Sequence, residues 1–402
     1  MVASKTLVVD NGGCSIKIGY SKDSAPRIIS NAIVKSKNER KRVFVGNQID
    51  LLKDYSGLFY MLPFQKGYLV NWDVQRRIWD HVFGKEVFKV AFNETSLVFT
   101  EPYFNFTSIQ ETLDEIFFEE YEFNAVLRVN PAMLSMYQYV CNSSDSETVE
   151  RQCTLIVDSG YSFTHIVPFF RGRQIKHLTL RIDMGGKALT NHLKEIISYR
   201  QLHVLDETYV INQCKEDCCY VSENFEADMK SCKHKHCEQN TILREYVLPD
   251  YNEIQRGFMR MPIGHSAQGE EQTIKLANER FTVPELLFHP SDVGISQMGI
   301  AEAIVHAISQ CPAVLQPHFY ANIVLTGGSC LFKGFKRRLE TEVRSSCPRE
   351  YDVNITMPKC PIVNSWRGGA ELTRSDLFPE MLVSRKAYNE LGFRYCQQKF
   401  MS

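Results

Sequence analysis

The residues with the clearest chemical potential stand in two short turns, half a chain apart. Leu7-Val-Val-Asp-Asn-Gly12 recurs as Leu155-Ile-Val-Asp-Ser-Gly160. In each copy an aspartate, whose oxygens suit a divalent cation, precedes a glycine, which lets backbone N–H groups approach a phosphate. One copy alone would be explained as an ordinary hairpin turn. Two copies, each behind a short apolar strand, favour a duplicated α/β domain whose turns face one cleft.

The elements that must position these turns are predicted by local patterns. Each turn joins two strands, and the second strands are expected at Ser15 to Tyr20 and at Phe163 to Phe169. Apolar residues near helical spacing predict a helix from Asn71 to Phe83. Ser108 to Glu111 has the pattern of a capping box, and Asn130-Pro131 has that of a helix start.

The second half of the chain has a similar mixture of elements and one long polar segment. A strand is predicted from Asn322 to Thr326, and Phe335, Leu339 and Val343 mark one face of a following helix. Residues 222–275 are polar and contain several glycines and prolines. We therefore expect a long surface excursion there.

Length and composition limit the classes of function. The 402 residues suggest two lobes, and 44% hydrophobic with 23% charged residues is typical of soluble globular proteins. The net charge of -1 argues against direct, charge-driven binding of nucleic acid. No apolar run has the length of a secretory signal or of a membrane helix. The 13 scattered cysteines predict free thiols in the cytosol or nucleus.

With several further motifs, the two turns resemble the phosphate loops of actin. The further motifs occur in the order found in that family: Gly67-Tyr-Leu-Val-Asn-Trp-Asp73, Thr100-Glu-Pro102, Asp183-Met-Gly-Gly186, Asn278-Glu-Arg-Phe281, Thr326-Gly-Gly328 and Trp366-Arg-Gly-Gly369. The resemblance spans essentially the whole chain. It implies an α/β actin-like ATPase fold, in which duplicated ribonuclease-H-like domains form two lobes around a nucleotide cleft.

The resemblance also implies domain boundaries. Residues 1–150 together with 362–402 are expected to form the first lobe, with a small outer subdomain at 31–66. Residues 151–361 are expected to form the second lobe. Its outer subdomain should occupy about 187–275, with a family-specific insertion near 250–273.

A set of ATP-binding residues follows from the same resemblance. Asp10 and Asp158 would hold Mg²⁺ through water, and Lys17 would reach the terminal phosphates. The other expected contacts are backbone N–H groups and a pocket for base and ribose, from Gly12, Gly13, Gly160, Gly186, Lys215, Glu216, Gly327, Gly328 and Ser329. Binding of ATP with Mg²⁺ stays open, because the same aspartates and glycines could persist as turn formers alone.

Four positions in the cleft depart from the family pattern. Tyr161 and Ser162 stand where the family has an acid and a glycine, and Cys14 stands at a small, usually glycine, position. The glutamine that orients water in actin aligns with Pro131, which has no side-chain donor or acceptor. Because phosphoryl transfer depends on positioning and electrostatics, hydrolysis should be slow or absent, and no catalytic residue is assigned.

Polymer formation is also expected to be lost. The loop that inserts into the neighbouring actin subunit corresponds to Lys35 to Arg42, where six of eight residues are charged and five are basic. Burying them against another copy would carry a large desolvation cost. The same residues could equally be a nuclear-localisation signal or a solvated loop tip. At the second polymer contact, Pro290-Ser291 is followed by Asp292-Val293 in place of the Phe-Leu of actin.

Three other features were considered as sites. Cys232 to Cys237 holds four potential zinc ligands in six residues, but adjacent His236 and Cys237 suit one tetrahedral ion poorly, so no zinc is expected. His165 is expected to be a packed residue and not a base. Partner binding is favoured for the insertion residues of types common at interface cores, namely Tyr251, Arg256, Phe258, Met259, Arg260 and Met261.

Within the actin family the chain looks most like the sixth class of actin-related proteins. The stretches that carry this likeness are Leu62 to Gly67, Glu101 to Phe106, Ile197 to His203 and Tyr246 to Asp250. The likeness implies a nuclear, non-catalytic scaffold subunit of a Swr/SRCAP-type chromatin-remodelling complex, which exchanges the Z variant of histone H-two-A into nucleosomes. The class is also linked to heterochromatin.

The implied partners are a segment of the remodeller's motor ATPase, small complex subunits and, indirectly, nucleosomal histones. A membrane and a homopolymer are not expected. Two alternatives stay open at this point. The chain could be a cytoplasmic, cytoskeletal actin relative, or an active ATPase or sugar-kinase-like enzyme of the same superfold, because a shared fold does not fix function.

Overall fold

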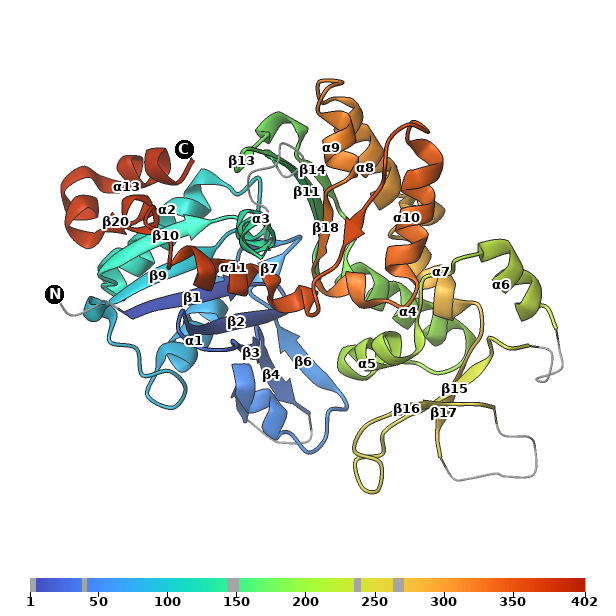
Figure 1. The fold of residues 1–402 in the computed structure, drawn as a ribbon. Coiled ribbons are helices and arrows are strands. Elements are labelled where there is room, and N and C mark those ends of the chain that lie inside the picture. Colours follow the sequence, from blue (N-terminus) through green and yellow to red (C-terminus); the bar gives the residue numbers. More distant parts are fainter. Residues whose placement is uncertain (1–4, 38–41, 143–151, 235–239, 263–270, 402) are drawn as a thin grey trace.

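Two mixed sheets form the centre of the molecule (Figure 1). The computed structural model describes residues 5–37, 42–142, 152–234, 240–262 and 271–401. The first sheet has the order β20-β10-β9-β1-β2-β3. Its strands are β1 (Lys5–Asn11), β2 (Ser15–Tyr20), β3 (Arg27–Ser30), β9 (Thr95–Thr100), β10 (Ala125–Val129) and β20 (Val383–Ser384).

The second sheet repeats the plan of the first. It has the order β13-β12-β11-β18-β19, and β14 also pairs with β12. Its strands are β11 (Cys153–Ser159), β12 (Thr164–Phe170), β13 (Arg173–Gln174), β14 (Leu180–Ile182), β18 (Ile323–Thr326) and β19 (Ile355–Thr356). β1 is antiparallel to β2 and parallel to β9, just as β11 is antiparallel to β12 and parallel to β18. The predicted pair of hairpins is therefore confirmed.

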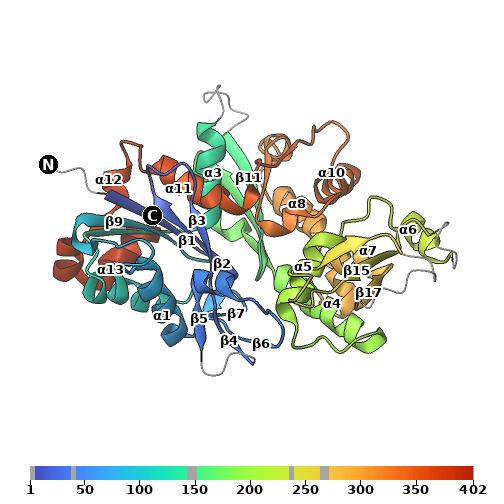
Figure 2. The same cartoon turned by 90° about the horizontal axis from the view of Figure 1, so that it is seen from below.

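Helices cover the sheets and connect their strands (Figures 1 and 2). Within the described ranges the first lobe contains α1 (Trp72–Phe83), α2 (Thr107–Glu115), α3 (Pro131–Cys141), α11 (Asn364–Leu372), α12 (Phe378–Met381) and α13 (Arg385–Met401), which is interrupted at Gly392. The second lobe contains α4 (Gly186–Arg200), α5 (Thr208–Cys218), α6 (Phe225–Cys232), α7 (Glu279–Glu285), α8 (Ile300–Ser309), α9 (Gln316–Tyr320) and α10 (Phe335–Ser346). No helix in this part of the chain is long and apolar enough to cross a membrane.

The helix starts agree only in part with the sequence patterns. Asn71 caps α1 by accepting a hydrogen bond from the backbone N–H of Val74, as its pattern indicates. The capping box predicted at Ser108 is wrong. α2 begins at Thr107, and Phe106 is its N-cap residue without a side-chain hydrogen bond. The Phe106 ring lies 5.0 Å from that of Tyr68, so a tertiary contact, not a local cap, fixes this helix start.

Residues 222–275 are more structured than predicted. Their described part contains α6 and the small sheet β16-β15-β17, formed by β15 (Arg244–Val247), β16 (Phe258–Arg260) and β17 (Thr273–Leu276). Tyr246 and Ile274 are fully buried in this sheet. The polar composition hid short strands with buried positions, so the expectation of a simple surface excursion was wrong.

A second small sheet lies at the outer end of the first lobe. It has the order β5-β4-β6, from β4 (Ile33–Ser36), β5 (Val43–Val45) and β6 (Leu58–Met61), and a short hairpin of β7 (Phe64–Gln65) and β8 (Tyr68–Leu69) follows. The two small sheets lie at the same end of the molecule, below the two central sheets in Figure 1.

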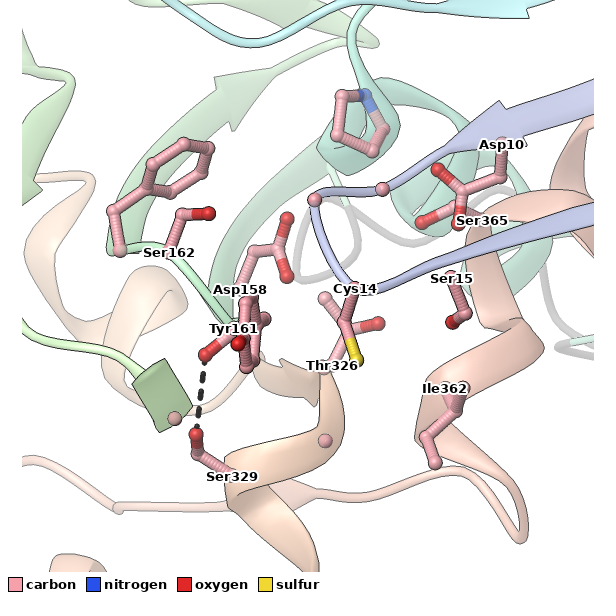
Figure 3. Close-up of a pocket in the computed structure, with 18 of the residues that line it drawn as sticks. Asp10, Cys14, Ser15, Asp158, Tyr161, Ser162, Thr326, Ser329, Ile362 and Ser365 are labelled. Carbon is pink, nitrogen blue, oxygen red and sulfur yellow. Dashed lines mark hydrogen bonds between the residues drawn. The ribbon is translucent and has the colours of Figure 1, made fainter. Parts of the chain in front are cut away.

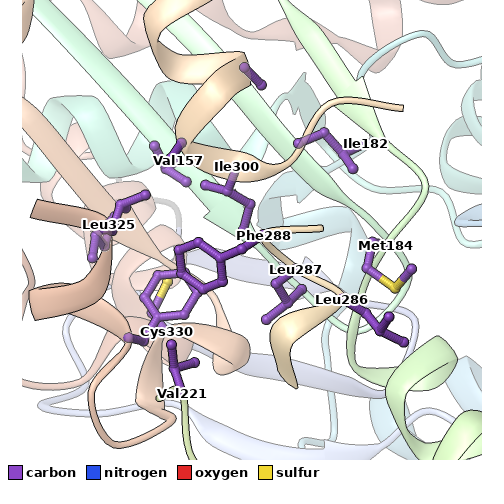
Figure 4. Close-up of a cluster of buried hydrophobic side chains, with 14 of the residues drawn as sticks. Val157, Ile182, Met184, Val221, Leu286, Leu287, Phe288, Ile300, Leu325 and Cys330 are labelled. Atoms are coloured by element: carbon purple, nitrogen blue, oxygen red, sulfur yellow. The ribbon is translucent and has the colours of Figure 1, made fainter. Parts of the chain in front are cut away.

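Each lobe has its own hydrophobic core. In the second lobe, Phe288 lies among buried side chains that include Leu325 of β18 and Ile300 of α8 (Figure 4). The first-lobe core gathers around Trp79, whose ring lies 5.7 Å from that of Phe99. Two cores of this kind give each central sheet a rigid base from which its hairpin turn projects.

α3 packs against both central sheets and therefore joins the lobes. Leu134 lies in a cluster with Val8 of the first sheet, whereas Met136 lies in a cluster with Ile156 of the second. On its other side α3 contacts α11 so closely that a Cβ atom at Gly368 would stand 1.8 Å from the carbonyl oxygen of Leu134. Only glycine allows this approach of the two backbones.

We predict that Gly368→Ala destabilises the protein by about 1–3 kcal/mol, because α11 and α3 must separate to admit the methyl group. Urea unfolding followed by circular dichroism would measure the loss. Arg367→Ala is the matched control, since Arg367 is exposed on the same helix. Equal midpoints for the two variants would contradict the close contact.

Candidate functional site

A cavity of ≈ 430 Å³ lies where the two hairpin turns face each other (Figure 3). Its walls come from both lobes, with β1–β2, β9 and α3 on one side and β11–β12, α4, α5 and the turn after β18 on the other. The lining includes all of the residues for which the sequence implied nucleotide or metal contacts: Asp10, Gly12, Gly13, Lys17, Asp158, Gly160, Gly186, Lys215, Glu216, Gly327, Gly328 and Ser329. The fold therefore brings the whole predicted set together.

The first turn is held in place by hydrogen bonds from neighbouring elements. Thr100, at the end of β9, donates its hydroxyl proton to Asp10 Oδ1 over 2.8 Å and accepts from the backbone N–H of Asn11 over 3.0 Å. Asn31 donates to the carbonyl oxygen of Gly12 over 2.9 Å. The Asp10 carboxylate thus points into the cavity from a fixed backbone.

The second turn is held by a hydrogen bond of its own and by hydrogen bonds from neighbouring elements. The backbone N–H of Gly160 donates to the carbonyl oxygen of Phe163 over 3.0 Å. The carbonyl oxygen of Gly160 accepts from the backbone N–H of Gly186 over 3.0 Å and from the hydroxyl of Ser329 over 3.2 Å (Figure 3). The N–H expected to face a phosphate is therefore engaged within the protein, and Ser329 supports the turn.

The two aspartates share one electrostatic environment. Loss of solvent around the carboxylate of Asp158, together with the nearby charge of Asp10, raises its pKa from 3.8 to about 6. Lys17 opposes this shift and lies 3.6 Å from the nearer oxygen of Asp10. Two carboxylates and one ammonium leave an excess of negative charge at the base of the cavity, which is the condition that a hydrated divalent cation would relieve.

Lys215 lies in the wall of the cavity, but its ammonium group is hydrogen-bonded to neighbouring protein groups. Its Nζ donates to the carbonyl oxygen of Gly186 (3.1 Å), the hydroxyl of Thr190 (2.8 Å) and the side-chain oxygen of Asn212 (2.9 Å). Three donors are thus engaged, and burial lowers the pKa of Lys215. Glu216 is exposed and accepts from Asn212 over 2.8 Å, so it is the more accessible of the two residues.

The turn after β18 forms the third side of the cavity. Gly327 has a φ of 92°, and a Cβ atom there would stand 2.2 Å from the carbonyl oxygen of Ser159. Glycine is therefore needed at this position both for the backbone conformation and for the close approach of β11. Beyond it Leu331, Phe332 and Ile362 add an apolar wall, which the sequence motifs did not indicate.

The four positions that depart from the family pattern also line the cavity. Pro131 stands at the first position of α3 without a polar side-chain atom to offer. The side chain of Tyr161 lies 3.6 Å from the position that a Cβ atom at Gly186 would take, and Ser162 Oγ lies 2.7 Å from the corresponding position at Gly13. Cys14 lies at the surface of the cleft, and the partial loss of solvent around its thiol raises the pKa of that group.

One carboxylate beside Pro131 could be mistaken for a general base. Glu101 lines the cavity, but its oxygens accept from Arg128 (2.6 Å), Gln110 (3.0 Å) and Asn105 (2.9 Å). Arg128 also donates to Asp114 through two nitrogens, so the network is buried and internally paired. Both oxygens of Glu101 therefore accept hydrogen bonds from the protein, and these bonds hold the wall at β9 in place.

The residues that line the cavity fit the binding of nucleotide and Mg²⁺ better than they fit hydrolysis. Two facing carboxylates, Lys17 and the glycines of the first turn suit a metal–phosphate group. When bound, Mg²⁺ would supply positive charge to the phosphates, with Asp10 and Asp158 holding its water ligands. At the position of the family's water-orienting glutamine, Pro131 has no side-chain donor or acceptor, and the oxygens of the neighbouring Glu101 accept hydrogen bonds from Arg128, Gln110 and Asn105.

Two other sequence features lie away from this chemistry. His165 is fully buried, as expected of a packed residue, with its ring 4.2 Å from that of Phe163, and burial lowers its pKa to about 3. Neither ring nitrogen has a hydrogen-bond partner among the described residues, and the expectation that His165 is not a base stays a prediction. Residues 235–239 of the Cys232 to Cys237 segment lie outside the described residues. Among those described, no group of three or more metal-binding side chains occurs. The expectation of no zinc stays a prediction.

We predict that Asp158→Asn stabilises the nucleotide-free protein by on the order of 2 kcal/mol at pH 7. The folded-state pKa of Asp158, about 6, lies above its unfolded value, so ionised Asp158 destabilises the fold at pH 7. As the pH falls from 6 towards 4, the wild-type carboxyl becomes protonated in the folded state and the advantage of the variant should vanish.

Urea unfolding of both proteins at several pH values in the presence of a chelator measures this difference. Asp352→Asn, at an exposed position, is the matched control and should change stability by less than about 0.5 kcal/mol. A stability difference for Asp158→Asn that is independent of pH would contradict the assigned electrostatics.

Comparison with known proteins gives a consistent assignment. Residues 1–401 match the family model described as Actin. An actin-related protein 6 of Drosophila melanogaster is 43% identical, over 99% of this chain and 100% of that protein. An actin-like protein ARP6 of Cryptococcus neoformans is 42% identical, over 100% and 86%, and an actin-related protein 6 of Arabidopsis thaliana is 37% identical, over 99% of each. The predicted resemblance and the actin-like fold are thereby confirmed, and the chain belongs to the actin family, among actin-related proteins of the sixth class.

Proposed function

We propose that this chain is a non-catalytic scaffold subunit of a nuclear, Swr/SRCAP-type chromatin-remodelling complex, which exchanges the Z variant of histone H-two-A into nucleosomes. A role in heterochromatin and transcription regulation goes with that assignment. Its direct partners are a segment of the motor ATPase and small complex subunits, and it meets nucleosomes through them. The chain resides in the nucleus and also in the cytoplasm.

The observation that carries the non-catalytic part is the water-positioning wall of the cleft. Pro131 lines that wall with no hydrogen-bonding side chain, and Glu101 beside it is engaged by Arg128, Gln110 and Asn105. A hydrolase of this shape needs a group there that orients water. With this group absent, ATP and Mg²⁺ would act in the cleft as a fixed ligand that stiffens the lobes.

Exposed side chains on the outer subdomain support a scaffold role. Phe258 and Met259 of β16, with Met261 beyond it, are 44%, 39% and 57% exposed. Aromatic and methionine side chains are types enriched at interface cores, and they sit here on a small sheet that shares the second-lobe core with α5, through Tyr246 and Cys218. This surface is the first candidate for contact with a partner subunit.

Affinity purification of the tagged full-length chain from nuclear extract tests the assembly. We expect a motor ATPase and small remodeller subunits to co-elute in stoichiometric amounts. A triple variant, Phe258→Ser/Met259→Ser/Met261→Ser, should lose at least one of these subunits while it still folds. Recovery of tubulin or motor proteins in place of remodeller subunits would refute the proposal in favour of a cytoskeletal role.

A phosphate-release assay on the purified protein tests the absence of turnover. We expect the wild-type protein to release phosphate from Mg-ATP no faster than Lys17→Ala, which lacks the cation nearest to Asp10. Wild-type turnover that Lys17→Ala abolishes would assign genuine ATPase activity and contradict the non-catalytic reading. A further comparison concerns assembly: Lys17→Ala should leave the complex intact if its architecture does not depend on bound nucleotide.

A further inference from the structure

The mouth of the cleft is bridged by contacts between the two outer subdomains. The ring of Tyr55, just before β6, stacks on that of Tyr209 in α5, with centroids 4.3 Å apart and planes inclined by 12°. Tyr251 adds a third ring, 6.0 Å from Tyr55. Beside them the backbone N–H of Gly57 donates to both carboxylate oxygens of Glu207, at 3.0 and 3.1 Å. We call these five residues the tyrosine clasp.

The first-lobe side of the clasp is ordered by its own turn. Asp54 Oδ1 accepts from the backbone N–H of Ser56 over 2.8 Å and from its hydroxyl over 2.6 Å. Gly57 then takes a φ of 56°, in the left-handed region. This turn presents the Tyr55 ring and the Gly57 N–H towards the other lobe before any contact is made, which lowers the entropic cost of closing the clasp.

The second-lobe side is ordered in a similar way. Asp250 Oδ1 accepts from the backbone N–H groups of Asn252, Glu253 and Ile254, at 2.9, 3.0 and 2.8 Å. Between them Tyr251 has a φ of 60°, a conformation that non-glycine residues seldom adopt. Such a conformation persists only where its surroundings impose it, and here it directs Tyr251 to the clasp.

A second bridge lies closer to the cavity. Arg181 Nη2 donates to the carbonyl oxygen of Lys66 over 2.6 Å. Its guanidinium group also lies 4.8 Å from the ring centroid of Tyr68 and 4.7 Å from that of Phe163, so it stacks between rings from the two lobes. An exposed ion pair of Lys37 with Asp206, at 3.3 Å, adds little by itself.

The clasp is separate from the nucleotide cavity. None of its five residues lines the cavity, and each of its contacts joins protein to protein. β6 and α5 lie next to one another in both views of the fold (Figures 1 and 2). Closure of the mouth therefore needs no nucleotide as a bridge between the lobes.

We propose that the tyrosine clasp is a closure device that holds the two lobes of this chain together at the mouth of the cleft without a ligand. The loop that carries Tyr251 lies in the segment for which the sequence favoured partner binding, and in this proposal part of that segment serves the cleft instead. The inference concerns the isolated chain, so it does not depend on the scaffold assignment.

Hydrogen exchange of the full-length, nucleotide-free protein tests the clasp. Tyr209→Ala changes the second lobe only, yet it should speed exchange of the Gly57 amide in the first lobe by about two- to tenfold, the range expected for loss of one stacked aromatic pair. Tyr55→Ala should have the reciprocal effect on the Ile211 amide of α5, which donates to the carbonyl oxygen of Glu207 over 3.0 Å. The double variant should add little to either single change, because both remove the same contact.

Tyr199→Ala is the matched control. It also removes a tyrosine from the second lobe, but Tyr199 is 91% exposed, so exchange in the first lobe should not change. If Tyr209→Ala does not fold, Glu207→Ala replaces it. Glu207 makes no side-chain hydrogen bond to α5, so its loss tests the cross-cleft contact with Gly57 alone. Effects confined to the mutated lobe would overturn the proposal.

Discussion

The repulsion between two facing carboxylates is the constraint that the rest of the cleft has to accommodate. Asp10 and Asp158, at the ends of two like strands, are brought face to face by the duplicated sheets, with Lys17 as the nearby cation. Neighbouring elements hold this arrangement in place. Thr100 fixes the carboxylate of Asp10 by a hydrogen bond, and α3 packs against the cores of both lobes. A fold that places two acids on facing turns of one cleft has the charge distribution of a metal–phosphate site.

Local sequence signals were sufficient for the parts of the fold that are local. The bounds of β2 agree with the prediction because a hairpin is determined by its own turn and alternation, and α1 begins after the asparagine that caps it. The helix start at Ser108 was predicted wrongly because a ring contact between Phe106 and Tyr68 overrides the capping pattern. The small sheet around Tyr246 escaped prediction because its partner strands are separated by polar chain.

For the cleft, the sequence could identify the polar and glycine residues of the lining but not the hydrogen-bond partner of each side chain. The order of the motifs along the chain, taken with the family resemblance, was enough to place the expected aspartates, lysines and glycines in one cavity. The hydrogen bonds of Lys215 to Thr190 and to the carbonyl oxygen of Gly186 depend on how α4 packs on α5, which no local pattern encodes. The same holds for the contact between Tyr55 and Tyr209, whose residues are far apart in the chain.

In the second hairpin turn, both backbone groups of Gly160 are hydrogen-bonded within the protein. Its N–H donates to the carbonyl oxygen of Phe163, and its carbonyl oxygen accepts from Gly186 and Ser329. Such a loop has a defined shape without a ligand, because both of these groups already have partners within the protein. A phosphate that used the N–H of Gly160 would first have to displace the carbonyl oxygen of Phe163, so this turn would oppose binding by about 1 kcal/mol, the net worth of one internal hydrogen bond.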